Sequence, residues 1–387
     1  MLAAGFLIVL VGGGARFALG LTLKPVVEEF GWPRTYLGIA FALYFVVTAI
    51  ATFYAGKIAD RMSLRTLLAA GLVISSAGIG LMSQMSAPWH ALLLYGVLFA
   101  IGNGAISTVP VGVMVTRAFS KSTGLANAAV LSGITVGQLV MIFGLTAVLA
   151  AIGWRSVFFW LGMLHIAFML VLFAIPDERA SIARAAGAPQ AGMTLTEASR
   201  TRQFWILLAI YAICGLDDFF VTTHVVAFAQ DRGVGAVIAG NMLALMGLTG
   251  TIGVILGGWW GDRSNAAWPT LASFAIRIVI FTLVWFDQSP LSIAVFALMF
   301  GATFLVTAPL TVLFVRDAFG TRHLGAISGI ITLVHQTFGG LGAYGGAWIF
   351  DTTGRYDIAF VIVLVATVAA LGLTLCLDRK PRALATP

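Results

Sequence analysis

Long apolar runs alternate with short polar turns along almost the whole chain. Glycines, prolines and small clusters of charge mark the breaks, and most runs approach the roughly 20 residues that a membrane-spanning helix needs. We therefore predict an all-α membrane protein with twelve transmembrane helices. The predicted spans are 2–23, 35–55, 67–84, 90–116, 124–150, 156–175, 204–229, 237–260, 268–286, 290–315, 324–349 and 357–376.

One long polar stretch divides these spans into two sets of six. It covers residues 176–203, which read PDERASIARAAGAPQAGMTLTEASRTRQ. We predict a cytoplasmic linker here, with a short surface helix from Thr194 to Thr201. The two halves are then residues 1–175 and residues 204–387, the second ending in a short cytoplasmic tail.

The second half repeats the first at an offset of about 202 residues. GKIADR, beginning at Gly56, returns as GWWGDR from Gly258. Similarly, 13–31 (GGARFALGLTLKPVVEEFG) matches 215–233 (GLDDFFVTTHVVAFAQDRG), with Asp218 at the place of Arg16. Repeats in a membrane chain indicate a transporter with pseudo-symmetric halves and a site between them.

Composition and charge exclude several classes of protein. The chain is 60% hydrophobic and 10% charged, whereas soluble domains are about one-quarter charged. The formal charge of +7 comes from basic residues scattered through short loops, so no nucleic-acid-binding surface is predicted. The opening MLAAGFLIVL lacks a basic segment before it, and we interpret it as a spanning helix and not a signal peptide.

The distribution of lysine and arginine predicts the orientation. With both termini in the cytoplasm, fifteen of these residues face inside and five outside. The inner set is Lys57, Arg61, Arg65, Arg117, Lys121, Arg179, Arg184, Arg200, Arg202, Arg263, Arg316, Arg322, Arg379, Lys380 and Arg382. The outer set is Lys24, Arg34, Arg155, Arg232 and Arg355. We expect a multi-pass protein of the cell (inner) membrane.

The sequence contains no signature of catalysis or of a cofactor. It has no nucleotide-binding loop, no His/Cys cluster at metal-ligand spacing and no nucleophile–base motif. Cys214 and Cys376 lie in apolar runs and are interpreted as small core residues without a disulfide or a metal. The expected partners are a small-molecule substrate, protons and the lipid bilayer, and a monomer is expected.

One loop and two runs of predicted helix carry a resemblance to a known family. The loop GKIADRMSLR resembles the signature between helices 2 and 3 of the major facilitator superfamily, with Ser63 where that family usually has Gly. The opening GGGARFALGLTLKPVVEEFGW and the run HQTFGGLGAYGGAWIFDTTGRYDIAF resemble the bacterial monocarboxylate and oxalate/formate porters. This resemblance covers essentially the whole chain and implies transport of a monocarboxylate together with a proton.

The chain departs from that porter group at two charged positions. Carboxylate-carrying members commonly have an arginine late in helix 8, where this chain has Val254. Helix 11 carries His335 and Gln336 and no lysine. The group's anion-binding pair therefore has no counterpart at those positions.

Arg16 and Asp218 are the leading candidates for the site. An ionisable group inside an apolar run costs roughly 2.5–3.5 kcal/mol on insertion scales, so it needs a partner or a water-filled cavity. A guanidinium can bind a carboxylate substrate through two parallel hydrogen bonds. Alternatively, Arg16 and Asp218 form an ion pair across the pseudo-twofold axis that holds the two halves together.

Asp217 and Asp218 are the candidate proton carriers, together with His224. Adjacent residues of a helix point about 100° apart, so only one of the two carboxylates can face a central cavity. Asp217 shares a helix face with His224, seven residues later. A carboxylate in an apolar setting holds its proton more readily, as a proton carrier must. The alternative is that these carboxylates cap a helix break at Gly215 or pair with Arg277.

The remaining polar residues within spans have two possible uses. His335 and Gln336 are candidate substrate or proton-relay groups, and a hydrogen-bonded core histidine is the alternative. Arg277 is expected to bond a carbonyl or an acid as a structural residue. Further polar groups could line the cavity or bond helix to helix. They are Asn103, Asn127, Gln138, Asn241 and Thr307, of which Asn103 and Gln138 are the candidate substrate ligands.

The two Asp-Arg loops are the candidate gate, since pairing at helix ends can stabilise one of two conformations. The gating residues are Gly56, Asp60, Arg61, Arg65, Asp262 and Arg263. The predicted function is transport of a monocarboxylate together with a proton by alternating access. The alternatives are a transporter of a larger aromatic or heterocyclic compound, in vitamin uptake or drug efflux, and a transport-inactive sensor or assembly factor.

Overall fold

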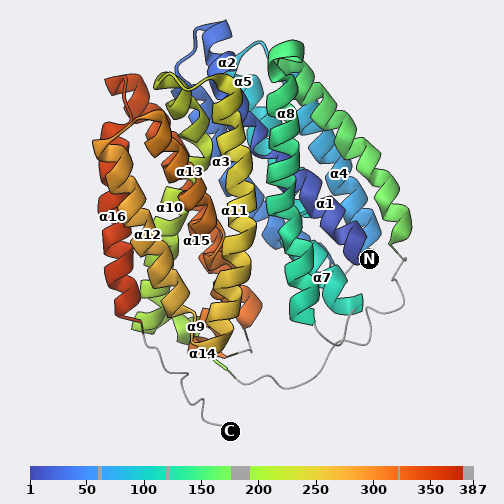
Figure 1. Ribbon diagram of the computed structural model, residues 1–387. Coiled ribbons are helices and arrows are strands. Elements are labelled where there is room, and N and C mark those ends of the chain that lie inside the picture. Colours follow the sequence, from blue (N-terminus) through green and yellow to red (C-terminus); the bar gives the residue numbers. More distant parts are fainter. Residues whose placement is uncertain (60–62, 119–122, 176–191, 321–322, 378–387) are drawn as a thin grey trace.

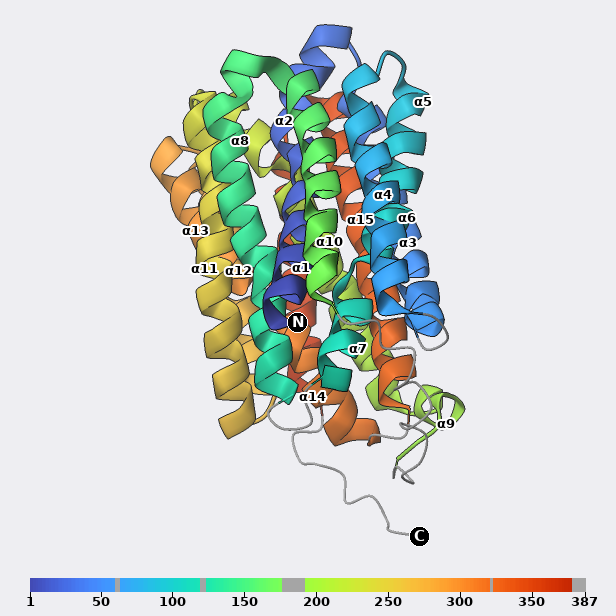
Figure 2. The ribbon, with the colours of Figure 1, turned by 90° about the vertical axis from the view of Figure 1, so that its right-hand side faces the viewer.

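The computed structural model describes residues 1–59, 63–118, 123–175, 192–320 and 323–377. Within these residues the chain is almost entirely helical, as the apolar runs predict. Figures 1 and 2 show an elongated bundle in which most helices run close to its long axis. The α2 and α5 ends lie at one face, and the start of α1, α7, α9 and α14 lie at the other.

The first half contains six helical rods, several of them interrupted. In chain order its elements are α1 (Leu2–Ala15), α2 (Ala18–Phe30), α3 (Arg34–Ala59), α4 (Leu64–Leu81), η1 (Met82–Gln84), α5 (Pro88–Ala91), the π-helical η2 (Leu92–Phe99), α6 (Ala100–Ala105), α7 (Thr108–Ala118), α8 (Thr123–Ala167) and η3 (Phe168–Ala174).

The second half follows the same plan. Its elements are α9 (Leu195–Ser199), α10 (Arg202–Asp231), α11 (Ala236–Arg263), α12 (Ala267–Phe286), α13 (Pro290–Phe304), α14 (Thr307–Phe319), α15 (Leu324–Thr353) and α16 (Asp357–Leu375). The helix α9 is the predicted short helix of the linker, capped by Thr194 and Glu197. The greater part of the predicted linker lies outside the described residues.

The twelve predicted spans are all accounted for. Nine stretches of the described chain are long and apolar enough to cross a membrane. One of them, Ala129–Ala174, covers two predicted spans, because α8 continues through a non-helical break at Gly153. The predicted spans 290–315 and 324–349 correspond to α13 with α14 and to α15.

Glycines at equivalent places confirm the internal repeat. Gly31 (φ 65°) and Gly233 (φ 82°) follow the first rod of each half, and Gly153 (φ 73°) and Gly354 (φ 72°) precede the last. A positive φ is strained for residues with a side chain, so glycine is required at these turns. The two halves therefore share backbone geometry as well as sequence.

Small residues at the helix contacts allow neighbouring helices to approach each other closely. A Cβ at Gly137 would lie 2.2 Å from the Leu10 carbonyl, so α8 can contact α1 only because the residue is glycine. A Cβ at Gly215 on α10 would lie 1.9 Å from the His335 carbonyl on α15. Between the halves, α3 packs on α15 and α8 packs on α11. These contacts bring α10 and its carboxylates to the centre of the bundle.

Candidate functional site

The helix α10 is the most deeply buried long helix of the described chain. Most of its residues from Phe204 to Ala229 are buried, including Asp217 and Asp218, which are 0% and 1% exposed. It packs against α15 and α16 of its own half and against α2 of the other half. Polar groups on this helix must therefore find partners inside the protein.

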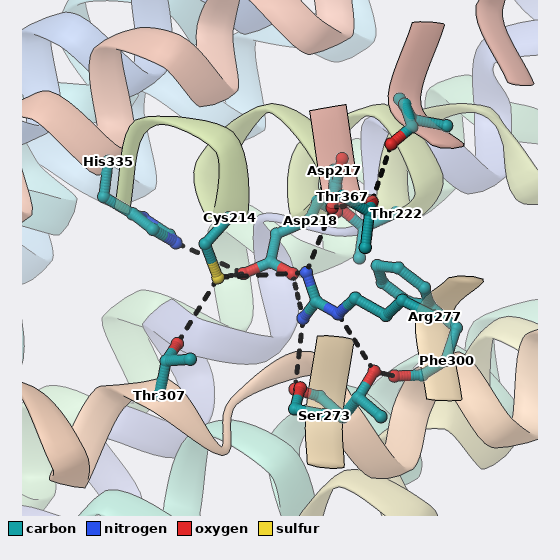
Figure 3. Close-up of polar contacts among 12 residues, drawn as sticks. Cys214, Asp217, Asp218, Thr222, Ser273, Arg277, Phe300, Thr307, His335 and Thr367 are labelled. Atoms are coloured by element: carbon teal, nitrogen blue, oxygen red, sulfur yellow. Dashed lines mark hydrogen bonds and ion pairs between the residues drawn. The ribbon is translucent and has the colours of Figure 1, made fainter. Parts of the chain in front are cut away.

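Asp218 lies at the centre of a charged cluster. Its carboxylate is 2.6 Å from Nη2 of Arg277, which is 0% exposed, and 3.2 Å from Nε2 of His335. Figure 3 shows the carboxylate between the imidazole on one side and the guanidinium on the other. The His335 side chain is 18% exposed, so it is the member of this cluster with access to space outside the core.

Asp217 completes the cluster on the side away from His335. It accepts a hydrogen bond of 2.8 Å from the Thr367 hydroxyl and lies 3.7 Å from Arg277. Its second carboxylate oxygen is buried without a hydrogen-bond partner. Arg277 also donates to the Thr303 carbonyl at 3.1 Å. The sequence analysis expected a structural bond from Arg277 to a carbonyl or an acid, and the structure provides both.

Cys214, Asp218 and His335 place possible metal-ligand atoms within 4.8 Å of one another. The Arg277 guanidinium lies 3.8 Å from the Cys214 sulfur and already neutralises Asp218. A metal cation would have to displace this guanidinium from a buried site, at a high electrostatic cost. The donor set therefore suits an arginine-centred cluster better than a metal. Cys376, in contrast to its expected place in the core, is exposed at the end of α16.

Arg16 lies at the break between α1 and α2. The Tyr95 hydroxyl, from the π-helical η2, donates to the Arg16 backbone carbonyl at 2.6 Å, which helps to satisfy the interrupted helix. The guanidinium lies over the Phe17 ring, 4.7 Å from its centroid. Among the described residues it makes no ion pair and no side-chain hydrogen bond, and its buried Nε has no partner.

Arg16 and Asp218 form no direct ion pair in this conformation, although the Asp218 charge acts on the Arg16 guanidinium. Asp218 is instead paired with Arg277, which reaches α10 from α12 within the same half. The repeat correctly gave the two residues equivalent positions, but it could not show that a second arginine would take the carboxylate. The consequence is a cation at the middle of the bundle without a direct ion pair among the described residues.

Arg16 lines a small cavity between the two halves. The other lining residues are Phe17, Phe41, Phe45, Phe219, Thr222 and Thr223. Its free volume of about 10 Å³ holds no more than a water molecule. The Thr223 hydroxyl is buried and, like Arg16 Nε, has no hydrogen-bond partner. Two residues with unpartnered polar groups thus line a cavity whose other walls are mainly aromatic.

His224 belongs to a separate network nearer the α2 face, by which we mean the end of the bundle that carries the turn from Phe30 to Arg34. Its Nε2 is 2.8 Å from the Ala343 carbonyl, and its Nδ1 is 3.0 Å from the Tyr356 hydroxyl. The carbonyl can only accept, so the neutral Nε2–H tautomer satisfies both contacts. This arrangement favours a structural role for His224 over the proton-coupling role expected from the sequence.

The same network joins the two halves at the α2 face. Arg34 donates to the Tyr356 hydroxyl at 2.8 Å and pairs with Asp231 at 2.9 Å. Lys24 also reaches Asp231, at 3.2 Å. Asp351 accepts from the backbone N–H of Arg34 at 2.9 Å and from Thr35.

We call these six residues, Lys24, Arg34, Thr35, Asp231, Asp351 and Tyr356, the α2-face latch. Within the described part of the chain, every ion pair that joins the halves lies in it. The structure is thus closed at this face. The sequence analysis counted Arg34 and Lys24 only as loop charges, since their partners are about 200 or more residues away in the chain.

The two predicted polar ligands are engaged between helices. Asn103 on α6 donates to the Gly12 carbonyl at 2.9 Å, and Gln138 on α8 donates to the Leu243 carbonyl at 2.9 Å. Both side chains are buried, and Gln138 Oε1 has no partner. Gln336, beside His335 on α15, is half-buried.

The predicted gate is only partly within the described residues. Asp60 and Arg61 lie outside them, and the side chain of Asp262 is not described. Arg263 stacks on Trp259 at 4.3 Å, and Arg65 lies 5.1 Å from the Phe173 ring. Gly56 faces Val109 on α7, leaving little room for a side chain. The gating role of these residues stays a prediction.

The fold and the buried charged cluster define a polytopic membrane transporter built from two repeated halves. The family model of the Major Facilitator Superfamily matches residues 5–343, and the chain belongs to that superfamily. This membership indicates a transporter of small molecules and not an enzyme.

Similar proteins cover nearly the whole chain. The "Uncharacterized MFS-type transporter YcxA" of Bacillus subtilis is 27% identical over 92% of this chain and 90% of that protein. "Monocarboxylate transporter 13" of Bos taurus is 22% identical over 97% and 88%. A bacterial homologue of the human lysosomal transporter Spinster, solved in an inward-facing and occupied conformation, has a TM-score of 0.77 at 18% identity, covering 97% of this chain and 95% of that one. Other relatives are named as multidrug resistance proteins and a hexuronate transporter, so the relatives do not single out one substrate class.

Proposed function

We propose that this chain is a proton-linked transporter of small monocarboxylates, with Arg16 as the ligand of the carboxylate. The observation that carries the proposal is that one cavity is lined by both Arg16 and Thr223, whose Nε and hydroxyl have no hydrogen-bond partner. A half-buried cation without a direct ion pair is costly, and an organic anion would reduce that cost. The guanidinium offers the paired donors that fit a carboxylate, and the hydroxyl adds a third.

The charges at the middle of the bundle support coupling to one proton. With both carboxylates ionised, Asp217 and Asp218 balance the two positive charges of Arg16 and Arg277. A bound monocarboxylate adds one negative charge, and a proton taken up with it restores neutrality. Charge in a low-dielectric interior is expensive, so the neutral combination is the one favoured to cross.

His335 is the proposed carrier of that proton. Its imidazole contacts Asp218 and is the least buried group of the cluster. Its ring also packs edge-to-face on Phe219, with centroids 5.5 Å apart, and Phe219 lines the Arg16 cavity. The imidazole is therefore close to both the Asp218 carboxylate and the proposed carboxylate site. Asp217, whose second oxygen has no hydrogen-bond partner, is the alternative carrier.

The predicted orientation gives the direction of opening. If both termini lie in the cytoplasm, the α2 face is the outer face of the cell membrane, and the latch closes the outer entrance. Substrate would then exchange with the cytoplasm in this conformation and with the outside once the latch opens. The water-sized cavity must also widen for any substrate to enter.

The test is ligand binding to the purified full-length protein in nanodiscs. The probes are benzoate, benzamide and benzamidinium, which have similar shapes and carry negative, zero and positive charge. We expect measurable binding of benzoate alone, weakened about 10- to 100-fold by Arg16→Gln and less by Arg16→Lys. Arg232→Gln, at the end of α10 and outside the cavity, is the matched control and should leave binding unchanged.

The same probes test the alternative function. Relatives named as multidrug resistance proteins and the aromatic lining are compatible with transport of a larger aromatic or heterocyclic compound. That function would give equal or tighter binding of benzamide or benzamidinium. Benzoate binding that survives Arg16→Gln would also contradict the proposal.

A further inference from the structure

Two aromatic rings from opposite halves meet face to face in the Arg16 cavity. Phe45 on α3 and Phe219 on α10 have ring centroids 3.7 Å apart and planes inclined by 26°. Both rings are buried, at 5% and 4% exposure, and both line the cavity. Since the two halves move relative to each other in alternating access, this stacked pair must separate when the cavity widens.

The surroundings fix the plane of the Phe219 ring. A Cβ at Gly339 on α15 would lie 1.7 Å from Phe219 Cδ2, so the ring rests directly on the glycine backbone. The edge of the His335 ring supports it from the same helix, at 5.5 Å and 75°. A ring held in this way presents a flat face toward Phe45 in any conformation that keeps α10 and α15 packed.

We propose that the substrate is a planar aromatic monocarboxylate whose ring inserts between Phe45 and Phe219 while its carboxylate binds Arg16. Separation of the two rings by a further 3.5–4 Å, about one aromatic thickness, creates a slot bounded by two flat faces. A substrate ring replaces the lost ring–ring contact with two new ones. An aliphatic body of the same size cannot stack on either face.

This inference rests on the proposed function, because the carboxylate end is held by Arg16. It adds the class of the substrate body, which neither the charge at Arg16 nor the relatives specify. The four remaining lining residues are compatible with this class of substrate. Phe17 and Phe41 add further aromatic surface, and Thr222 and Thr223 are the polar lining residues besides Arg16, of which Thr223 has a hydroxyl without a hydrogen-bond partner.

The experiment compares benzoate with cyclohexanecarboxylate, two seven-carbon monocarboxylates of which only the first is planar. Binding to the full-length protein in nanodiscs should favour benzoate about 2- to 12-fold, the range expected from aromatic stacking. Phe219→Leu should bring this ratio close to one, chiefly by weakening benzoate. Phe281→Leu is the matched control, because Phe281 is equally buried in the same half but does not line the cavity.

A second variant tests the same point without removing a ring. In Gly339→Ala the new methyl group must displace the Phe219 ring, so the ratio should fall while cyclohexanecarboxylate binding changes little. Phe45→Leu should act like Phe219→Leu. A purely structural role of the ring pair as a hydrophobic plug would alter both affinities together and leave the ratio unchanged.

The outcomes separate the two proposals. If both acids bind equally and both need Arg16, the aromatic slot is wrong and the carboxylate site stands. If neither acid binds, or binding persists in Arg16→Gln, the carboxylate site itself is wrong and the slot fails with it. A ratio that survives Phe219→Leu, Phe45→Leu and Gly339→Ala overturns the slot alone.

Discussion

Removal of Arg277 is the sharpest perturbation of the charged cluster. Arg277→Met keeps most of the side-chain volume but leaves Asp217 and Asp218 buried together without their cation. The ion pair with Asp218 is 2.6 Å long and its partners are 0% and 1% exposed, so solvent screening is minimal. Loss of one partner of such a pair is expected to cost about 3–5 kcal/mol of stability.

The geometry predicts how strongly each single variant lowers the stability relative to the others. Arg277→Met should be the most destabilising, because it strands two carboxylates. Asp218→Asn should lower the stability less, since Arg277 still has two partners, Asp217 at 3.7 Å and the Thr303 carbonyl at 3.1 Å. Asp217→Asn should lower the stability least. The Asp217 carboxylate is the farther of the two from the guanidinium, and the asparagine amide oxygen can still accept the hydrogen bond from Thr367.

The double variant Asp218→Asn, Arg277→Met completes a thermodynamic cycle. It should be more stable than the sum of the single effects implies, with an interaction energy of about 1–3 kcal/mol. The assay is thermal unfolding of the purified protein in one detergent, followed by intrinsic fluorescence, at a fixed heating rate. Additive effects, or Asp217→Asn being more damaging than Arg277→Met, would refute the assignment of Arg277 as the cluster's counter-ion.

Three further predictions concern the α2-face latch, His335 and the loop that begins at Gly56. Asp231→Asn removes the carboxylate shared by Lys24 and Arg34. If the network contributes about 1.5 kcal/mol, the population of molecules open at the α2 face should rise about tenfold. The rate at which a cysteine introduced beside Thr35 is labelled measures this population. Equal labelling in both proteins would exclude a latch. His335→Gln should abolish the pH-gradient dependence of uptake while substrate exchange at equal pH continues, and gradient-driven uptake at the wild-type rate would contradict the proton role. Asp60→Asn should lower turnover and leave equilibrium binding nearly unchanged, whereas a large loss of affinity at normal turnover would contradict a gating role.

Much of the fold could be predicted from the sequence because its physical cause is local. A spanning helix needs only a long apolar run, and all twelve predicted spans have counterparts in the structure. The repeat also follows from the sequence alone, and glycines at equivalent turns confirm it. The interruptions at Arg16 and between α13 and α14 were not predicted, because a break inside an apolar run depends on neighbours such as Tyr95 that satisfy the freed carbonyl.

The site was only partly predictable, since its pairings join residues far apart in the chain. The sequence singled out Arg16, Asp217, Asp218 and His335 as ionisable groups in apolar surroundings. It named a pairing of these carboxylates with Arg277 as one alternative, which the structure shows, but it could not decide between this pair and an ion pair of Asp218 with Arg16. Nor could it identify Thr223, whose significance lies in an unpartnered hydroxyl beside Arg16. Knowledge of which helices are neighbours was required for both.

Electroneutral coupling is the central claim, and gradient-driven uptake in proteoliposomes tests it most directly. Radiolabelled benzoate uptake is measured with an inward proton gradient while valinomycin and potassium set the membrane potential, and protein-free liposomes give the diffusion background. We predict protein-dependent accumulation that follows the proton gradient, is independent of the potential and is lost in Arg16→Gln. Accumulation that follows the potential, or that persists without the guanidinium of Arg16, would contradict it.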